Sequence, residues 1–158
     1  MRRIIIYFIG ILITAAVVIV FICIYFTANI SETIPPIRKY GYKGSAHQLI
    51  DKIDSLAQNN SKIIFKVDEI LGNKSRGYSY AISITIKDSS KNLLYDLMCS
   101  SIHEVKFKTK LQLIGAHNLI NHTGGYGIKS DGINELLREF NSNIIVPLQE
   151  EGVNLEPL

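Results

Sequence analysis

The first part of the chain is almost entirely apolar, broken only by Gly10, Thr14, Thr27 and Asn29 after the basic residues at its start, and this distinguishes it from all that follows. Residues 4–30 are 27 positions without a charged side chain. As an α-helix, such a segment would measure about 40 Å at about 1.5 Å per residue, whereas the hydrocarbon core of a bilayer is about 30 Å thick. The apolar core of a cleavable signal peptide is only about 7–15 residues long, and no small-x-small cleavage site follows this segment. The pattern therefore predicts an uncleaved transmembrane anchor within residues 1–30.

Shorter patterned segments follow the predicted anchor. Residues 31–44 contain two adjacent prolines, two glycines and mixed charges, which predicts a linker. Ser45 and Gln48 have the spacing of a capping box, and they open a predicted helix whose apolar residues share one face. Four segments with period-two alternation come next and predict four strands, the clearest of which covers residues 78–87.

Beyond Gly115 the alternation stops, and residues 116–129 are predicted to be irregular. A second helix is predicted from about residue 130, because Ile133, Leu136, Leu137 and Phe140 form one apolar stripe. Residues 144–148 are a candidate fifth strand. Residues 149–158 are predicted to be a flexible tail.

These elements predict one α+β domain over residues 45–148, in the order α-β-β-β-β-α. Short connections and clean alternation favour an antiparallel sheet of four strands, or five with the candidate strand, that has one dry face. Each amphipathic helix needs an apolar surface, and the dry face of the sheet provides one. The economical arrangement is a two-layer sandwich with both helices on the same face.

Composition and charge limit the structural classes and the partners that the chain can have. A hydrophobic content of 47% with 20% charged residues excludes the disordered and fibrous classes. The formal net charge of +3 falls to +1 when Arg2 and Arg3 are left out, so the charge gives no indication of a nucleic-acid partner. The many Ile, Lys and Asn residues, together with few Ala, favour a bacterial source.

Basic residues flank both ends of the predicted anchor: Arg2 and Arg3 precede it, and Arg38, Lys39 and Lys43 follow it. The charge balance therefore does not orient the anchor by itself. An N-terminal anchor with a very short tail most often leaves that tail in the cytoplasm. This predicts a single-pass membrane protein with an extracytoplasmic, periplasmic C-terminal domain.

Candidate catalytic and metal-binding residues are few. No activating base is evident beside Cys99, and the sequence contains no Gly-x-Ser-x-Gly nucleophile motif. The histidines, which have no ligand spacing of a recognised metal site, are His47, His103, His117 and His122. We therefore expect no catalytic residue, no metal and no cofactor, and we keep an enzyme that uses Cys99 or a histidine as an alternative.

A glycine-rich segment, residues 122–127, precedes the second predicted helix. Backbone amides at a helix N-terminus can hold an anion, although Asp131 would compete for the same amides. Glycines that permit an unusual loop conformation explain the segment as well. The candidate anion-binding residues are Gly124, Gly125, Gly127 and Ser130.

The outward face of the predicted sheet is rich in lysine. Such lysines keep an open sheet face soluble, and the same face can dock an acidic partner protein or anionic lipid headgroups. The second predicted strand adds a strip of small side chains, which a partner surface can approach closely. The predicted partner-binding residues are Lys62, Lys66, Lys87, Lys106, Lys108 and Lys110.

These features favour a membrane-anchored extracytoplasmic domain that works by binding, as an accessory subunit of a bacterial envelope assembly. One alternative is an immunity-type protein that binds an incoming toxin, and the other is the membrane-tethered enzyme. The expected partners are the lipid bilayer, through residues 4–30, and a protein, with no nucleic acid and no small-molecule cofactor.

Overall fold

The computed structural model describes residues 35–73, 77–102 and 104–158. They belong to one compact unit that covers residues 34–158. The predicted anchor lies outside the described residues. Among the residues that are described, no helix combines the length and the apolar character needed to cross a bilayer.

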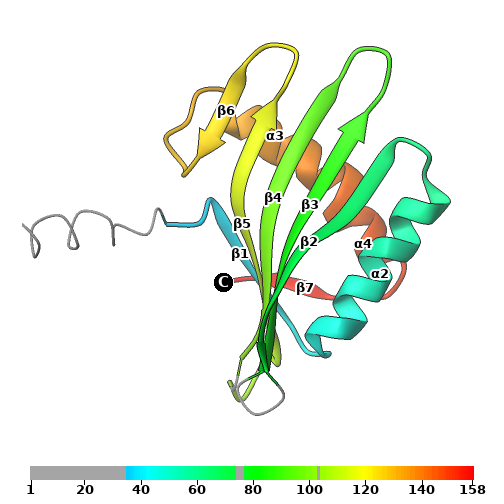
Figure 1. Cartoon of the computed structure of the whole chain (residues 1–158), viewed down its shortest axis with the longest axis vertical. Helices are drawn as coiled ribbons and strands as arrows, with labels where there is room; N and C mark the ends of the chain where they lie inside the picture. Colours follow the sequence, from blue (N-terminus) through cyan, green and yellow to red (C-terminus); the bar gives the residue numbers. More distant parts are fainter. Residues whose placement is uncertain (1–34, 74–76, 103) are drawn as a thin grey trace, which may run out of the picture. The chain divides into compact units, whose positions relative to one another are not determined.

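The described residues form one antiparallel sheet and two main helical segments (Figure 1). In chain order the elements are β1 (Arg38–Tyr42), α2 (Ala46–Asn59), β2 (Ile63–Asn73), β3 (Gly77–Lys87), β4 (Asn92–Ser101), β5 (Thr109–Asn118), β6 (Thr123–Tyr126), α3 (Ile133–Phe140), the π-helical turn η1 (Asn141–Ile145), α4 (Val146–Glu150) and β7 (Leu155–Pro157).

The strand order is β2-β3-β4-β5-β1-β7, and β6 also pairs with β5. β1 pairs with residues 109–113 of β5, whereas β6 pairs with residues 115–118. Because β4 occupies the other edge of β5, β1 and β6 follow one another along the same edge.

One face of the sheet carries the hydrophobic core. Along β4, Leu93, Tyr95, Leu97 and Cys99 are buried and alternate with partly exposed residues. The register places these four beside inward residues of β3 and β5. The apolar stripes of α2 and α3 belong to the same buried cluster. Both helices therefore cover one face of the sheet, and they leave its other face open.

Phe140, at the end of α3, occupies the centre of this core and is fully buried. Its ring lies 5.1 Å from the Tyr95 ring and 6.4 Å from the Tyr40 ring, measured between centroids. The Tyr95 hydroxyl donates to the Leu136 carbonyl oxygen at 3.0 Å, and the Tyr40 hydroxyl donates to Asn141 Oδ1 at 3.1 Å. These bonds satisfy the polar ends of two buried rings and join the second helical segment to β4 and β1.

The fold class and the first helix confirm the prediction. α2 begins after Ser45, whose hydroxyl accepts a hydrogen bond from the Gln48 amide while the Gln48 side chain accepts one from the Ser45 amide. This is the predicted capping box. The α+β character and the antiparallel sheet are also as predicted.

The predicted number of strands, four or five, is wrong, because the sheet has seven. β1 lies in the segment predicted as a linker and β7 in the predicted tail, yet the two pair with each other, and Tyr40 and Leu155 are buried. β6 lies in the stretch predicted to be irregular. These segments are too short to show an alternating pattern, and each becomes a strand because a partner strand satisfies its backbone.

The candidate fifth strand at residues 144–148 is also wrong, since these residues are helical. Ile144, Ile145 and Leu148 are buried with the spacing of one helix face. The turn before Pro147 is π-helical, and the Val146 amide bonds to the Asn141 carbonyl oxygen. A wider turn of this kind accommodates a proline whose ring would clash with a carbonyl group in a regular α-helix.

Candidate functional site

The open face of the sheet carries small and polar side chains on its central strands. On β3 the residues that alternate with the buried isoleucines are Ala81, Ser83 and Thr85, all partly exposed. The register places Ser83 between Lys66 on β2 and Asp96 on β4. Because the side chains of β3 are small, another surface can approach the middle of this face closely.

Three side chains of β4, β5 and β6 meet beside this strip, and we call them the Asp96–His117–Tyr126 cluster. His117 Nε2 lies 3.4 Å from Asp96 Oδ2. The Tyr126 hydroxyl forms a hydrogen bond with the Asp96 carboxylate, and the rings of Tyr126 and His117 meet edge to face with centroids 5.2 Å apart. The His117 and Asp96 side chains are 25% and 30% exposed, so the cluster is accessible from solvent.

Gly115 makes room for this cluster. It pairs with Asp96 on one side and with Tyr126 on the other, so the carboxylate and the phenol ring face each other over a residue without a side chain. A Cβ atom at this position would lie 2.7 Å from Asp96 Oδ2 and 2.8 Å from Tyr126 Cε1. The glycine that interrupts the sequence pattern of β5 therefore has a role in the site.

A β-bulge explains why the alternation appears to stop at Gly115. Asp96 pairs with Gly115 and Leu97 with Leu113, so Ile114 is an extra residue on β5. The extra residue shifts the alternation by one position, and both Leu113 and Ala116 are buried.

Asp96 acts on the pKa of its neighbour. Its charge raises the pKa of Tyr126 above the usual 10, because a phenolate would lie beside a carboxylate, and desolvation and the hydrogen bond between them add to the effect. Like an ordinary tyrosine, Tyr126 is a neutral hydrogen-bond donor at neutral pH. The cluster combines a carboxylate, an imidazole and a phenol, which can bind polar or cationic groups of a partner.

A second polar group lies next to this cluster on β2 and β3. Lys66 Nζ is 2.7 Å from Asp68 Oδ1, and the Ser83 hydroxyl bonds to the same carboxylate. The hydrogen bond from Lys66, followed by that from Ser83, lowers the pKa of Asp68. Because Ser83 pairs with Asp96, the two groups form one polar band that crosses the open face from β2 to β6.

Only part of this band followed from the sequence pattern. Lys66 was predicted on the outward face, and Ser83 belongs to the predicted strip of small side chains. His117 was considered only as a candidate metal ligand or catalytic histidine, and Asp68, Asp96 and Tyr126 were not predicted as site residues. Asp96 carries a usable signal, since it is the one charged residue among the apolar and small side chains of residues 93–101. The position of Tyr126 opposite Asp96 depends on the pairing of β5 with β6, which the sequence pattern did not predict.

The six predicted partner-binding lysines do not form one patch. Lys62 and Lys87 lie near one end of the sheet, since the Lys87 amide donates to the Lys62 carbonyl oxygen, whereas residues 106–110 lie at the other end. Half of them face carboxylates: the pairs are Lys62 with Asp88 at 4.0 Å, Lys66 with Asp68, and Lys106 with Glu156. Lys87, Lys108 and Lys110 form no ion pair with a residue that the structure describes.

The predicted anion-binding residues, Gly124, Gly125, Gly127 and Ser130, use several of their donors within the loop. The Gly124 amide donates to the Asp131 carbonyl oxygen at 2.7 Å, and the Ser130 hydroxyl donates to the Tyr126 carbonyl oxygen at 3.1 Å. The Ser130 amide bonds to the Gly127 carbonyl oxygen. These donors are therefore not available to an anion in this conformation.

The structure separates the histidines. His47 lies on α2 beside Asp51, His117 belongs to the open face, and His122 is exposed in the turn before β6. His103 lies outside the described residues. In the part of the chain that the structure describes, no three His, Cys, Asp or Glu side chains are grouped as metal ligands.

Cys99 lies on the core side of β4 with no exposed surface. Burial raises the pKa of its thiol to about 12. At pH 7 only about one molecule in 10⁵ would carry the thiolate, which is the nucleophilic form. The geometry thus gives no support to a thiol mechanism at this residue.

The native protein should therefore leave Cys99 unlabelled. In a Cys23→Ser background we expect a water-soluble maleimide to modify no thiol of the folded chain at pH 7.5 and one thiol in urea, as measured by intact mass. Labelling of the folded protein within minutes would show that the thiol is accessible and would restore the enzyme alternative.

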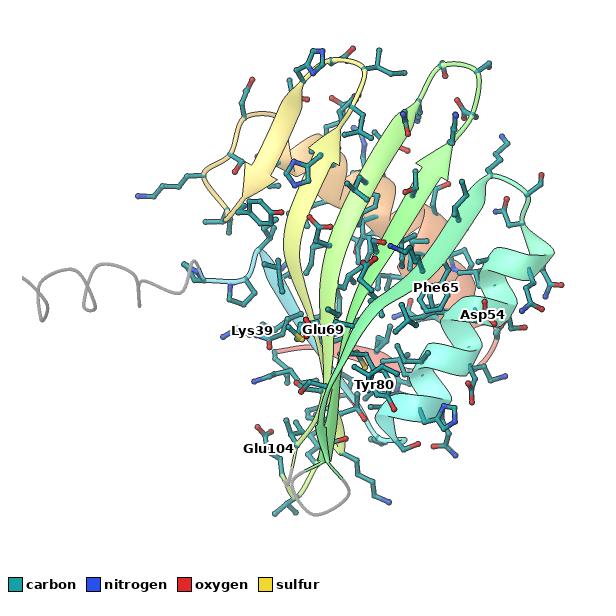
Figure 2. The ribbon with its side chains drawn as sticks, viewed as in Figure 1. Lys39, Asp54, Phe65, Glu69, Tyr80 and Glu104 are labelled. Atoms are coloured by element: carbon teal, nitrogen blue, oxygen red, sulfur yellow. The ribbon has the colours of Figure 1, made fainter. Side chains whose placement is uncertain are left out.

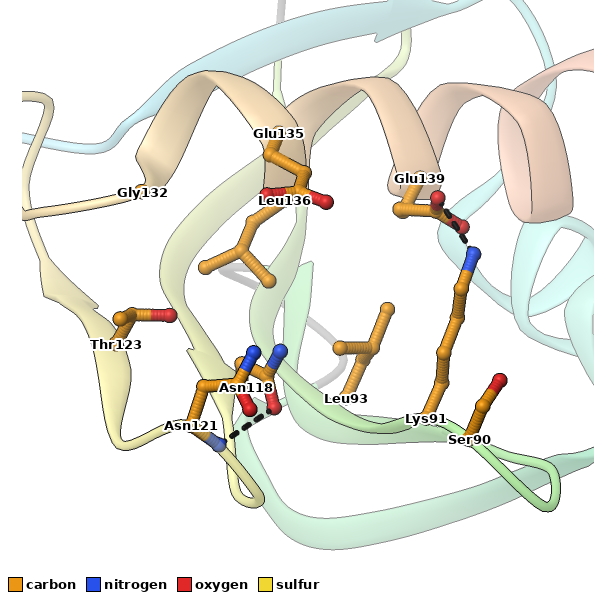
Figure 3. Close-up of a pocket in the computed structure, with 10 residues that line it drawn as sticks. All are labelled: Ser90, Lys91, Leu93, Asn118, Asn121, Thr123, Gly132, Glu135, Leu136 and Glu139. Atoms are coloured by element: carbon orange, nitrogen blue, oxygen red, sulfur yellow. Dashed lines mark hydrogen bonds and ion pairs between the residues drawn. The ribbon is translucent and has the colours of Figure 1, made fainter.

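A small pocket lies between α3 and the ends of β4, β5 and β6, and Figure 3 shows its lining. Its volume is about 130 Å³. On one side Lys91 Nζ lies 2.7 Å from Glu139 Oε1, and on the other Asn118 Oδ1 accepts a hydrogen bond from the Asn121 amide. Ligand sites usually measure about 300–1,000 Å³, so this pocket suits a few water molecules, and we place the candidate site on the open face.

No family model matches this chain, and no curated protein or solved structure is significantly similar to it. The function must therefore be argued from the geometry of the open face.

Proposed function

We propose that this chain is a membrane-anchored extracytoplasmic binding domain, an accessory subunit of a bacterial envelope assembly, that docks a partner protein on the open face of its sheet. The observation that carries the proposal is the polar band on the uncovered central strands. Its Asp96–His117–Tyr126 cluster lies outside the core and needs a glycine at position 115 to form.

The polar groups of the cluster take no part in the packing of the core. Neither the buried cluster nor the helices use the carboxylate of Asp96 or the ring of Tyr126. Partly exposed carboxylate, imidazole and phenol groups on a rigid sheet are suited to directional hydrogen bonds across an interface, with tyrosine among the residues enriched there. The small side chains of β3 allow the partner backbone to come close.

The chemical state of two candidate nucleophiles favours binding over catalysis. Cys99 is buried with a raised pKa, and the Ser83 hydroxyl is bonded to Asp68, which lies on the side away from His117. Neither the thiol nor this hydroxyl is therefore placed for activation by the imidazole of His117.

Site-specific photo-crosslinking in cells of the source organism tests the proposal. A photoreactive residue at Met98, which faces outward between Ala81 and Gln112, should give a discrete adduct with another protein. The same residue at Lys52, exposed on α2, should give none. Equal adducts from both positions, or none from Met98, would remove the open face as the docking site.

A matched pair of substitutions then locates the interaction in the cluster. Tyr126→Ala should lower the yield of the Met98 adduct about fivefold or more, because it removes a ring and a hydrogen-bond donor from an interface. Ile128→Ala, at a residue 61% exposed in the same connection, should leave the yield unchanged. Equal yields from the two variants would contradict a role for the cluster.

A further inference from the structure

We propose that one edge of the domain lies on anionic phospholipid headgroups of the membrane that holds the predicted anchor. This edge consists of β1, the connection between β4 and β5, and the first residues of β5. Its basic residues, which we call the basic edge, are Arg38, Lys39, Lys43, Lys106, Lys108 and Lys110. This proposal depends on one part of the proposed function, namely that residues 4–30 anchor the chain in the membrane.

The charges of the domain are polarised toward this edge. The described residues include 13 basic and 13 acidic side chains, so the described part of the domain carries no net charge apart from its histidines. Six of the basic residues lie on the basic edge with only Glu104 and Glu156, whereas seven basic and eleven acidic residues occupy the rest of the described part. The edge therefore carries a net charge of +4 and the remaining described residues −4, a distribution that orients the domain toward a negative surface.

Most of the positive charge on this edge lacks a partner. Glu156 forms ion pairs with both Lys43, at 3.7 Å, and Lys106. The other four members of the basic edge form no ion pair with any residue that the structure describes. Arg38, Lys39 and Lys108 are exposed, and Lys110 is partly exposed.

Strand pairing holds these residues on a rigid frame. Gly41 of β1 pairs with Lys110 of β5 and with Glu156 of β7, and the Lys108 amide donates to the Tyr42 carbonyl oxygen at 3.0 Å. The Phe107 ring covers Gly41 so closely that a Cβ there would lie 2.6 Å from the ring. Phe107 and Lys108, in the connection between β4 and β5, are therefore held against β1.

The connection also presents an apolar side chain. In Figure 2 the label of Glu104 shows where this connection lies, beyond the ends of β4 and β5. Val105, the next residue, is fully exposed. Lys106 follows directly. An exposed aliphatic side chain among basic residues suits the interfacial region of a bilayer, where it contacts acyl chains while the ammonium groups contact phosphates.

Chain length brings this edge within reach of the bilayer. Seven residues lie between Ile30 and Arg38, which makes eight Cα–Cα steps, so β1 begins at most about 28 Å from the end of the predicted anchor. Attraction to anionic lipid extends only about 8 Å at physiological salt, and a short tether keeps the domain near that zone. This continuity with the anchor, together with Val105, favours lipid over an acidic protein as the occupant.

Fluorescence quenching in vesicles tests the proposal with the full chain. Val105→Cys and Ser61→Cys, each in a Cys23→Ser background, place one label on the basic edge or in the turn after α2, at the other end of the sheet. Vesicles contain phosphatidylcholine alone or with about 30% phosphatidylglycerol, and a quencher is attached to a headgroup. We expect the label at residue 105 to be quenched about threefold or more in the anionic vesicles only, and high salt to abolish the difference. The label at residue 61 should not respond.

Charge variants give the matched control. The first triple variant combines Lys39→Gln, Lys108→Gln and Lys110→Gln. It should abolish the quenching of the label at residue 105 that anionic vesicles cause. The control triple variant combines Lys52→Gln, Lys87→Gln and Lys129→Gln, at three exposed lysines outside the basic edge. It changes the net charge by the same amount and should preserve the quenching. Equal quenching in both vesicles, or equal loss in both triple variants, would overturn the proposal. If the first triple variant instead lost a protein crosslink, the edge would be a protein site.

Failure of the anchor is a separate result. Chain released by a carbonate wash would contradict the membrane anchoring in the proposed function. Quenching of the label at residue 105 would still report on the headgroup contact in that case, because the basic edge of a released domain would be free to bind anionic vesicles from solution.

Discussion

Replacing Phe140 with alanine should lower the free energy of unfolding by about 3–5 kcal/mol. The side chain is fully buried and contacts the rings of Tyr95 and Tyr40. Two contributions make up this loss. The variant lacks the free energy that burial of the aromatic ring provides, and it leaves a cavity between the second helical segment and the sheet. Urea unfolding of the full chain in detergent, followed by circular dichroism, would measure the change.

Val146→Ala provides the control, because Val146 follows Phe140 in the same helical segment and is 44% exposed. It should change stability by less than about 0.5 kcal/mol. If both variants lost the same amount, the second helical segment would not be packed on the sheet as described.

Gly124→Ala should destabilise the protein by about 2–4 kcal/mol, which is the second-largest effect that we expect. Gly124 has a φ angle of +93°, a region that L-residues rarely adopt. A Cβ there would also lie 2.1 Å from the carbonyl oxygen of Ala116. Because that oxygen belongs to the backbone of β5, β6 would have to move away and the Asp96–His117–Tyr126 cluster would separate.

A second glycine separates the effect of backbone strain from the effect of the steric clash. Gly152 also has a positive φ angle, +83°, but a Cβ atom there would have no neighbouring atom within 4 Å. Gly152→Ala should therefore show the backbone strain alone, about 1–2 kcal/mol. Thermal unfolding of the two variants in parallel would contradict this account if Gly152→Ala were the more damaging change.

The positions of strands in this chain could be predicted only where they are long. β3 alternates over residues 78–87 and α2 carries a complete capping box, so local sequence was sufficient for both. β1 and β7 have five and three residues, and each is a strand because its partner supplies hydrogen bonds. Residues 144–148 show the converse, since an apolar run of this length does not distinguish a strand from a buried helical turn.

The candidate site was predictable to a smaller extent than the fold. The lysine-rich outward positions and the small residues of β3 followed from alternation, because side chains on a strand point to opposite faces in turn. The contact of Asp96 with His117 and Tyr126 joins three strands and depends on a bulge and on Gly115. No local pattern contains that information.

By itself, the sequence determined the class of the fold, the first helix, the long strands and the face that each residue of β3 occupies, since these depend on neighbours a few positions away. Tertiary structure alone decided that the two ends of the domain pair as β1 and β7, and that the glycine-rich segment becomes β6. It also decided which charges gather on one edge. These features arise from backbone hydrogen bonds and side-chain contacts between residues far apart in the chain, whose energies exist only after the sheet has formed.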